Sequence, residues 1–208
     1  LQMAKNTYTN LIRLGKIPAD VYYRYAILCM KTDDKDKAET IFKKVIQLDP
    51  KNPYAHKDLG VVYLSQRLFD YAKEEFETAY KMAPEDSAVV FEMANFYHAM
   101  NDFQKAKELY EKAFKLAPEV MDIAVFRAIN YLRLNEIDTA LELFLDAMKK
   151  YPSQHIILFN IGLIYYQKGN FDAAKEFLSA AYSLYQDPET MNALAMTFYE
   201  LKEYENSK

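Results

Sequence analysis

Three histidines and one cysteine are the residues of this sequence best suited to hold a metal ion or to act as a nucleophile. His56, His98 and His155 stand on or just before three different predicted helices. None of them has a second His or a Glu at metal-ligand spacing, as in HExxH. The single cysteine, Cys29, can form neither a disulfide within the chain nor a thiolate metal cage. We therefore expect structural or solvated histidines, and Cys29 as a small buried core residue.

An acidic run, Asp33-Asp34-Lys35-Asp36, supplies oxygen ligands of the kind that calcium prefers. It lacks the central Gly and the closing Glu of an EF-hand loop, so we interpret it as a polar turn. The chain has 4 glycines in 208 residues, too few and too scattered for a phosphate-binding loop. No metal, cofactor or catalytic residue is expected, and the chain is predicted not to be an enzyme.

The composition restricts the partners. A net charge of −4 provides no basic field for a nucleic-acid backbone. No apolar run approaches the roughly 20 residues that a membrane helix needs, so no direct membrane insertion is expected. The start Leu1-Gln2-Met3-Ala4 resembles the interior of a helix, which suggests a segment cut from a longer protein. The expectation is a soluble protein, cytoplasmic by default, whose targeting signals could lie outside the segment.

Six columns of similar residues recur every 34 residues. Prolines form the first column, at Pro50, Pro84, Pro118 and Pro152. Two columns hold small residues, Ala38, Ala72, Ala106, Ala140 and Ala174, and Ala26, Gly60, Ala94, Ala128 and Gly162. The last three are mainly aromatic or small, with members such as Tyr63, Phe76 and Ala79. Other helix breakers are few, so the pattern predicts repeated helices.

The segment 53–86 shows the pattern in full, with Leu59-Gly60, Tyr63, Ala72, Phe76, Ala79 and Pro84. In this order the residues resemble a complete tetratricopeptide repeat (TPR) motif. The resemblance implies an all-α fold, a right-handed α-solenoid of stacked antiparallel helix pairs. Within 53–86 we expect a first helix over about 53–66 and a second over about 70–83.

The resemblance covers essentially the whole chain. It predicts five units at 19–52, 53–86, 87–120, 121–154 and 155–187. Residues 1–18 are predicted to be the second helix of a preceding partial repeat, and 188–208 the first helix of a further, truncated repeat. Small residues such as Gly60 and Ala72 should lie where the two helices of a pair cross.

The resemblance places the first helices along a concave surface, where a partner would bind. Adjacent to the core-facing residues of these helices lies a stripe that the 3.6-residue period turns toward the concavity. The predicted groove residues are Tyr23, Ile27, Lys57, Val61, Leu64, Phe91, Asn95, His98, Val125, Ile129, Leu132, Phe159, Leu163, Tyr166, Met196 and Tyr199, with Met30 and Asn192 on the same stripe. The alternative for each residue is packing between neighbouring repeats.

Some TPR proteins grip the carboxylate tail of a chaperone through Lys, Asn and Arg on successive first helices. The matching positions here hold Tyr23, Ile27, Glu92, Asp122 and Phe126, which argues against that function. The apolar stripe instead favours an amphipathic helix or an extended apolar segment as ligand.

These observations predict a non-enzymatic scaffold that binds a protein or peptide partner. Two alternatives stay open: a recruiting or regulatory TPR module of a larger enzyme, and a self-assembling TPR protein that associates through uncapped ends. The apolar residues of segment 188–208, such as Leu194, Met196 and Phe198, favour the second alternative.

Overall fold

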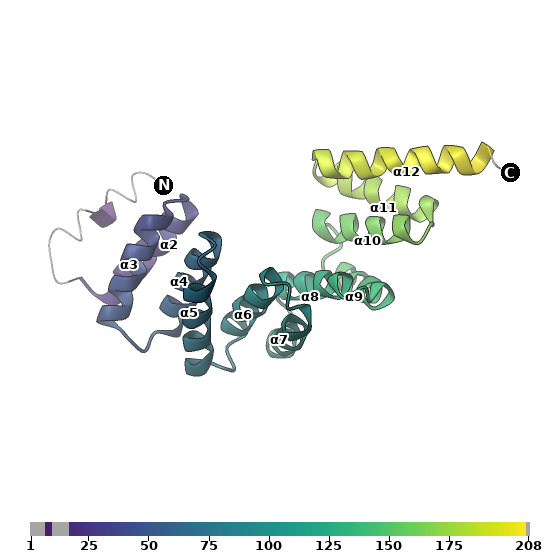
Figure 1. Cartoon of the computed structure of the whole chain (residues 1–208). Helices are drawn as coiled ribbons and strands as arrows, with labels where there is room; N and C mark the ends of the chain where they lie inside the picture. Colours follow the sequence, from purple (N-terminus) through teal and green to yellow (C-terminus); the bar gives the residue numbers. More distant parts are fainter. Residues whose placement is uncertain (1–6, 10–16, 207–208) are drawn as a thin grey trace. The chain divides into compact units, whose positions relative to one another are not determined.

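The structure, a computed structural model, describes residues 7–9 and 17–206, without the side chains of 203–206. This part of the chain consists of helices joined by short turns and loops, and no strand occurs among the described residues (Figure 1). Most of segment 1–18, predicted to be the second helix of an earlier repeat, lies outside the described residues. The fold is an all-α repeat fold, as the sequence predicted.

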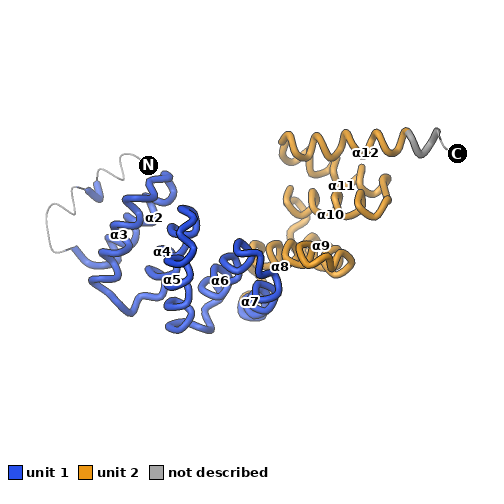
Figure 2. The backbone as a smooth tube through the Cα atoms, in the orientation of Figure 1, with its two compact units in different colours: residues 1–116 blue, residues 117–208 orange. Residues whose placement is uncertain are grey.

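The chain divides into two compact units, residues 1–116 and residues 117–208 (Figure 2). The helices of unit 1 are α2 (Ala19–Lys31), α3 (Lys35–Leu48), α4 (Pro53–Ser65), α5 (Phe69–Met82), α6 (Ser87–Ala99) and α7 (Phe103–Leu116). The helices of unit 2 are α8 (Met121–Arg133), α9 (Ile137–Lys150), α10 (His155–Gln167), α11 (Phe171–Leu184) and α12 (Pro188–Asn206).

In each unit, consecutive helices form hairpins that stack on one another. In unit 1 the hairpins are α2–α3, α4–α5 and α6–α7, joined by contacts of α3 with α4 and of α5 with α6. In unit 2, α8–α9 and α10–α11 pair in the same way, and α12 packs against both α11 and α10. No hairpin can bury its apolar face alone, so each depends on its neighbours.

The turn inside each hairpin has one backbone conformation. Its central residue has positive φ in every case, at Asp33, Arg67, Asn101, Asn135 and Gly169. The next amide donates to a carbonyl five residues back, as from Leu68 to Tyr63 at 2.9 Å and from Asn170 to Tyr165 at 2.9 Å. This Schellman arrangement satisfies carbonyl groups at the end of the first helix. Asn and Gly tolerate positive φ well, and the structure shows that Asp33 and Arg67 also adopt it here.

The loops between hairpins contain the prolines of the repeat. The second helices end at Leu48, Met82, Leu116 and Lys150, each two residues before a proline. Proline lacks the N–H that would continue the helix. Pro53 starts α4, as predicted, and the Asn52 side chain accepts hydrogen bonds from the amides of Tyr54 and Ala55.

The core lies where the two helices of a hairpin cross. The alanines of the second helices, Ala38, Ala72, Ala106, Ala140 and Ala174, are all 0% exposed. A Cβ atom at Gly60 would lie 2.9 Å from the Phe76 ring, and one at Gly162 would lie 2.7 Å from Leu178 Cγ. The small residue of the first helix therefore makes room for a large side chain of the second.

We predict that Ala72→Leu lowers the free energy of unfolding by about 1–3 kcal/mol, because the added atoms have no space at a fully buried position. Lys73→Leu introduces the same side chain one residue away on the exposed face of α5, and should change stability by less than about 0.5 kcal/mol. Urea denaturation followed by far-UV circular dichroism measures both. Equal stabilities for the two variants would contradict the packing described here.

Candidate protein-binding groove

The three histidines contact neighbouring side chains, and the cysteine is buried. Cys29 is 0% exposed, in agreement with its prediction as a core residue. His56 Nδ1 lies 2.6 Å from Glu75 Oε2, which links the two helices of one hairpin. The His98 ring packs edge-on against Phe103 and Tyr110. No three His, Cys, Asp or Glu side chains gather as a metal site within residues 7–9 and 17–206.

In α2 and α4, the predicted groove stripe packs against the core of unit 1. Tyr23, Ile27, Val61 and Leu64 are partly buried, and all four contact the cluster around Tyr25, as does Met30. These side chains pack between repeats, which was the alternative that the sequence left open.

Tyr23 and Lys57 also take part in a polar link between α2 and α4. The Tyr23 hydroxyl donates to Asp58 Oδ2 at 2.6 Å, and Lys57 Nζ lies 2.6 Å from Asp58 Oδ1. Asp58 is 5% exposed, so its charge needs both partners. Burial, and then the hydrogen bond to Asp58, raise the pKa of Tyr23 well above its ordinary value.

In α6 the stripe surrounds a buried tyrosine. The Tyr110 hydroxyl donates to Asn95 Oδ1 at 2.7 Å, and the ring of Phe91 lies 5.9 Å from that of Tyr110. His98 contacts the same ring. Phe91, Asn95 and His98 are all partly buried, and each of them contacts Tyr110.

In unit 2 the stripe is not uniform. Val125 is 2% exposed, so it does not belong to an accessible apolar surface. The prediction of Val125 as a groove residue is therefore corrected. The neighbouring stripe residues Ile129 and Leu132 are partly buried. Met196 and Tyr199 on α12 are 47% and 64% exposed.

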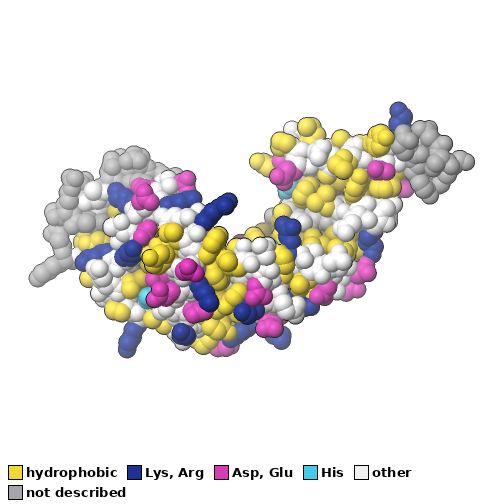
Figure 3. All heavy atoms as spheres, in the orientation of Figure 1, with side chains coloured by type: hydrophobic (Ala, Val, Ile, Leu, Met, Phe, Trp, Pro, Cys, Tyr) yellow, Lys and Arg dark blue, Asp and Glu magenta, His cyan; other side chains and the backbone are white. Residues whose placement is uncertain are grey.

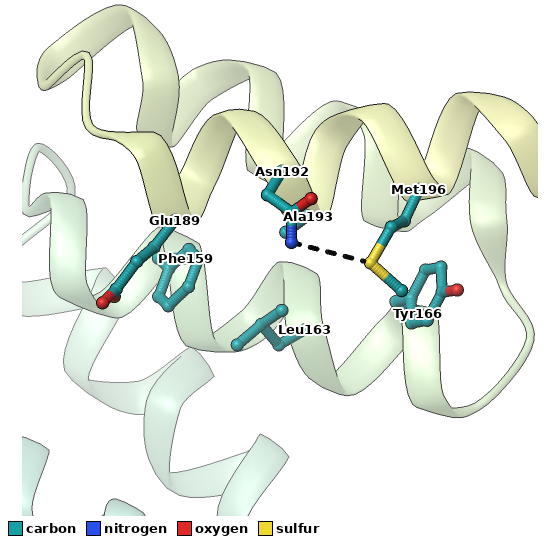
Figure 4. A pocket seen from close by; sticks show the side chains of 7 residues that line it. All are labelled: Phe159, Leu163, Tyr166, Glu189, Asn192, Ala193 and Met196. Atoms are coloured by element: carbon teal, nitrogen blue, oxygen red, sulfur yellow. Dashed lines mark hydrogen bonds between the residues drawn. The ribbon is translucent and has the colours of Figure 1, made fainter.

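A cavity of about 420 Å³ lies between α10 and α12. Figure 4 shows its lining residues, which are Phe159, Leu163, Tyr166, Glu189, Asn192, Ala193 and Met196. Four of them, Phe159, Leu163, Tyr166 and Met196, belong to the predicted groove, and Asn192 to the same stripe. Tyr199 does not line the cavity. Hydrophobic side chains gather over α10 and α12 in Figure 3.

Small and aromatic neighbours hold the walls of this cavity in place. Ala193, 9% exposed, is small enough for α12 to approach α10. The ring of His155 stacks on Phe159 at 5.8 Å with an interplanar angle of 10°. The ring of Tyr166 meets Phe171 edge-on at 5.5 Å. Phe159 and Tyr166 are thus supported from behind and present their free faces to the cavity.

His155 also ties α10 to the start of α12. Its Nε2 lies 2.8 Å from Thr190 Oγ1 and 2.9 Å from Asp187 Oδ2. Asp187 caps α12, because it accepts hydrogen bonds from the amide and the hydroxyl of Thr190. The bonds from Thr190, and then the nearby His155, lower the pKa of the Asp187 carboxyl.

Glu189 and Ala193 line the cavity although they are not on the stripe predicted from the sequence. Glu189 lies one turn before Asn192, so extending the stripe backward by three residues would have found it. Ala193 lies beside the stripe and lines the cavity because its side chain is short. No sequence signal distinguished it from the other alanines.

Comparisons with known proteins agree with this architecture. The family model described as the Cilia and flagella-associated protein 70 middle TPR-like domain matches residues 2–117, and a tetratricopeptide repeat model matches residues 127–189. The chain belongs to the tetratricopeptide repeat proteins, in the family of the middle TPR-like domain of cilia and flagella-associated protein 70. The resemblance found in the sequence is therefore confirmed.

Solved structures show the same fold at low sequence identity. Yeast Tom70 is 21% identical with a TM-score of 0.78 over 97% of this chain and 43% of its own. The Cut9–Hcn1 hetero-tetramer of APC/C is 14% identical, with a TM-score of 0.84 over 94% of this chain and 39% of its own. The TPR protein YrrB is 22% identical, with a TM-score of 0.66 over 91% of this chain and 96% of its own. This chain spans less than half the length of the first two. The comparison with curated proteins gave no match.

These findings define the general class of function. TPR proteins are generally non-catalytic scaffolds for protein–protein interaction, and the fold supports that role here. Among the described residues, no helix combines the length and the apolar character needed to cross a membrane.

We predict that Tyr23→Phe lowers the free energy of unfolding by about 1–2 kcal/mol, because Asp58 is buried and loses one of its two partners. Tyr54→Phe is the matched control. The Tyr54 hydroxyl also donates to a carboxylate, Asp86 at 2.6 Å, but Tyr54 is 42% exposed and water can replace it. Urea denaturation should show a smaller loss for the control. If Tyr23→Phe lowers the free energy of unfolding no more than Tyr54→Phe does, the bond between Tyr23 and Asp58 has no structural role.

Proposed function

We propose that this chain is a non-enzymatic scaffold that binds a peptide or helical segment of another protein, with apolar side chains of the partner in the cavity between α10 and α12. The observation that carries the proposal is the cavity of about 420 Å³, whose walls are mainly apolar and aromatic. Pockets of roughly 300–1,000 Å³ with such walls are typical of ligand sites. An amphipathic helix lying in an apolar groove is a recurring mode of peptide recognition.

The groove stripe is packed differently in the two units, and this difference supports a site in unit 2. In unit 1 its side chains pack against the core or surround Tyr110. In unit 2, Phe159, Leu163 and Tyr166 line a cavity and remain partly exposed. Aromatic side chains supply much of the energy at protein interfaces, so Phe159 and Tyr166 are the expected contact residues. Among the similar structures, YrrB is described as having an unusual peptide-binding site.

Selection of peptides tests the site, because it does not require that the natural partner be identified. A displayed library of helical peptides with randomised faces would be selected on the whole chain, and the enriched peptides measured by fluorescence anisotropy. Met196→Glu places a charge in the wall of the cavity and should weaken binding at least about tenfold.

Met191→Glu is the matched control for this experiment. Met191 lies on the same helix, is 55% exposed where Met196 is 47% exposed, and does not line the cavity. Binding that survives Met196→Glu, or that Met191→Glu weakens equally, would place the site elsewhere. Circular dichroism checks that both variants keep their helical content.

A second candidate function is self-association, favoured by the outer face of α12. Met191, Phe198 and Tyr199 are 55%, 51% and 64% exposed, an apolar group on one helix. If copies associate through this face, light scattering coupled to size-exclusion chromatography should show a mass that rises with concentration. Phe198→Glu should return the protein to a monomer. A single monomer mass for the unchanged chain at high concentration would reject self-association.

A further inference from the structure

The apolar cavity between α10 and α12 adjoins a second depression of different chemistry. This neighbour, about 380 Å³ in volume, is lined by His155, Tyr185, Asp187, Pro188 and Glu189. Glu189 lines both depressions. In Figure 4 its side chain lies beside Phe159, at the end of the cavity opposite Met196 and Tyr166. One end of the apolar site is therefore acidic.

The charges around the cavity are asymmetric. Helix α10 contains no Lys, Arg, Asp or Glu, and neither depression is lined by Lys or Arg. Lys168, which follows α10 at the Tyr166 end, pairs with Asp138. The Tyr166 end of the cavity is lined by uncharged residues, and the Phe159 end by a carboxylate.

The two carboxylates at the acidic end have different surroundings. Asp187 accepts both hydrogen bonds from Thr190 and faces His155, so its charge is used to cap α12 and to hold α10. Glu189 is exposed, and no hydrogen bond or ion pair to another described residue satisfies it. Because the Asp187 carboxylate is already engaged with Thr190 and His155, Glu189 is the carboxylate at this end that remains for a partner.

We infer that the partner segment carries a Lys or Arg next to its apolar anchor, with the anchor in the α10–α12 cavity and the basic side chain at Glu189. This inference rests on the proposed function and adds the chemistry and direction of the ligand. The exposed Tyr185 ring, 64% accessible, offers a surface for the aliphatic stem of the basic residue. Complementary charge of this kind sets orientation and specificity more than affinity.

The peptide selection described above also tests this inference. On the unchanged chain, enriched peptides should carry Lys or Arg within about four residues of the apolar anchor. Glu189→Lys should weaken their binding about threefold to tenfold at low ionic strength, and Glu189→Gln should weaken it less. The effect should shrink in high salt, since exposed charges are screened. Glu176→Lys, an exposed position on α11 that lines neither depression, makes the same change in net charge and should have no effect.

The outcomes separate the inference from the function on which it rests. Apolar peptides that are enriched without basic residues, and that bind the Glu189→Lys variant equally well, overturn the inference alone. Enriched peptides that carry acidic residues beside the apolar anchor would also overturn the inference alone. If the unchanged chain enriches peptides no better than the Met196→Glu variant does, the proposed function is overturned and the inference with it. Equal weakening by Glu189→Lys and Glu176→Lys would show a general charge effect and also reject the inference.

Discussion

The close approach of the two helices in each hairpin is the constraint on which the rest of the structure depends. Gly60 and Gly162 leave no room for a Cβ atom, because Phe76 and Leu178 of the paired helix occupy that space. The alanines of the second helices are fully buried at the same crossing. This complementarity of small and large residues sets the distance within each pair. Stacking of the pairs, and the surfaces they expose, follow from it.

The same repeat produces surfaces with different uses. In α2 and α4 the stripe beside the core contributes to packing, strengthened by the bond from Tyr23 to Asp58. Between α10 and α12, residues at equivalent positions line a cavity. The difference comes from the neighbouring helix, which presents the small Ala193 and the flexible Met196 at this point. Repeated architecture therefore allows one pair of helices to become a site without a change in the fold.

The titratable residues that first suggest chemistry serve mainly to connect helices. His56 reaches Glu75, and His155 reaches Asp187 and Thr190. Asp58 joins two first helices through its bond from Tyr23, and it pairs with Lys57 on its own helix. These groups are satisfied by protein partners, and their positions stabilise the stack. Glu189, exposed at the end of an apolar cavity, differs from them and gives the proposed site its direction.

The all-α fold, the positions of the helices within 53–86 and the buried small residues were predictable from the sequence. Each depends on local spacing, on Gly, Ala and Pro at a 34-residue period, and that spacing is repeated often enough to be recognised. The accessibility of the stripe was not predictable in this way. Val125 is buried, Tyr23 is tied to Asp58, and Phe159 faces a cavity, although all three share one helical register. A helical period determines the direction of a side chain, whereas its exposure depends on the size and position of side chains from the next hairpin, which only the tertiary structure brings together.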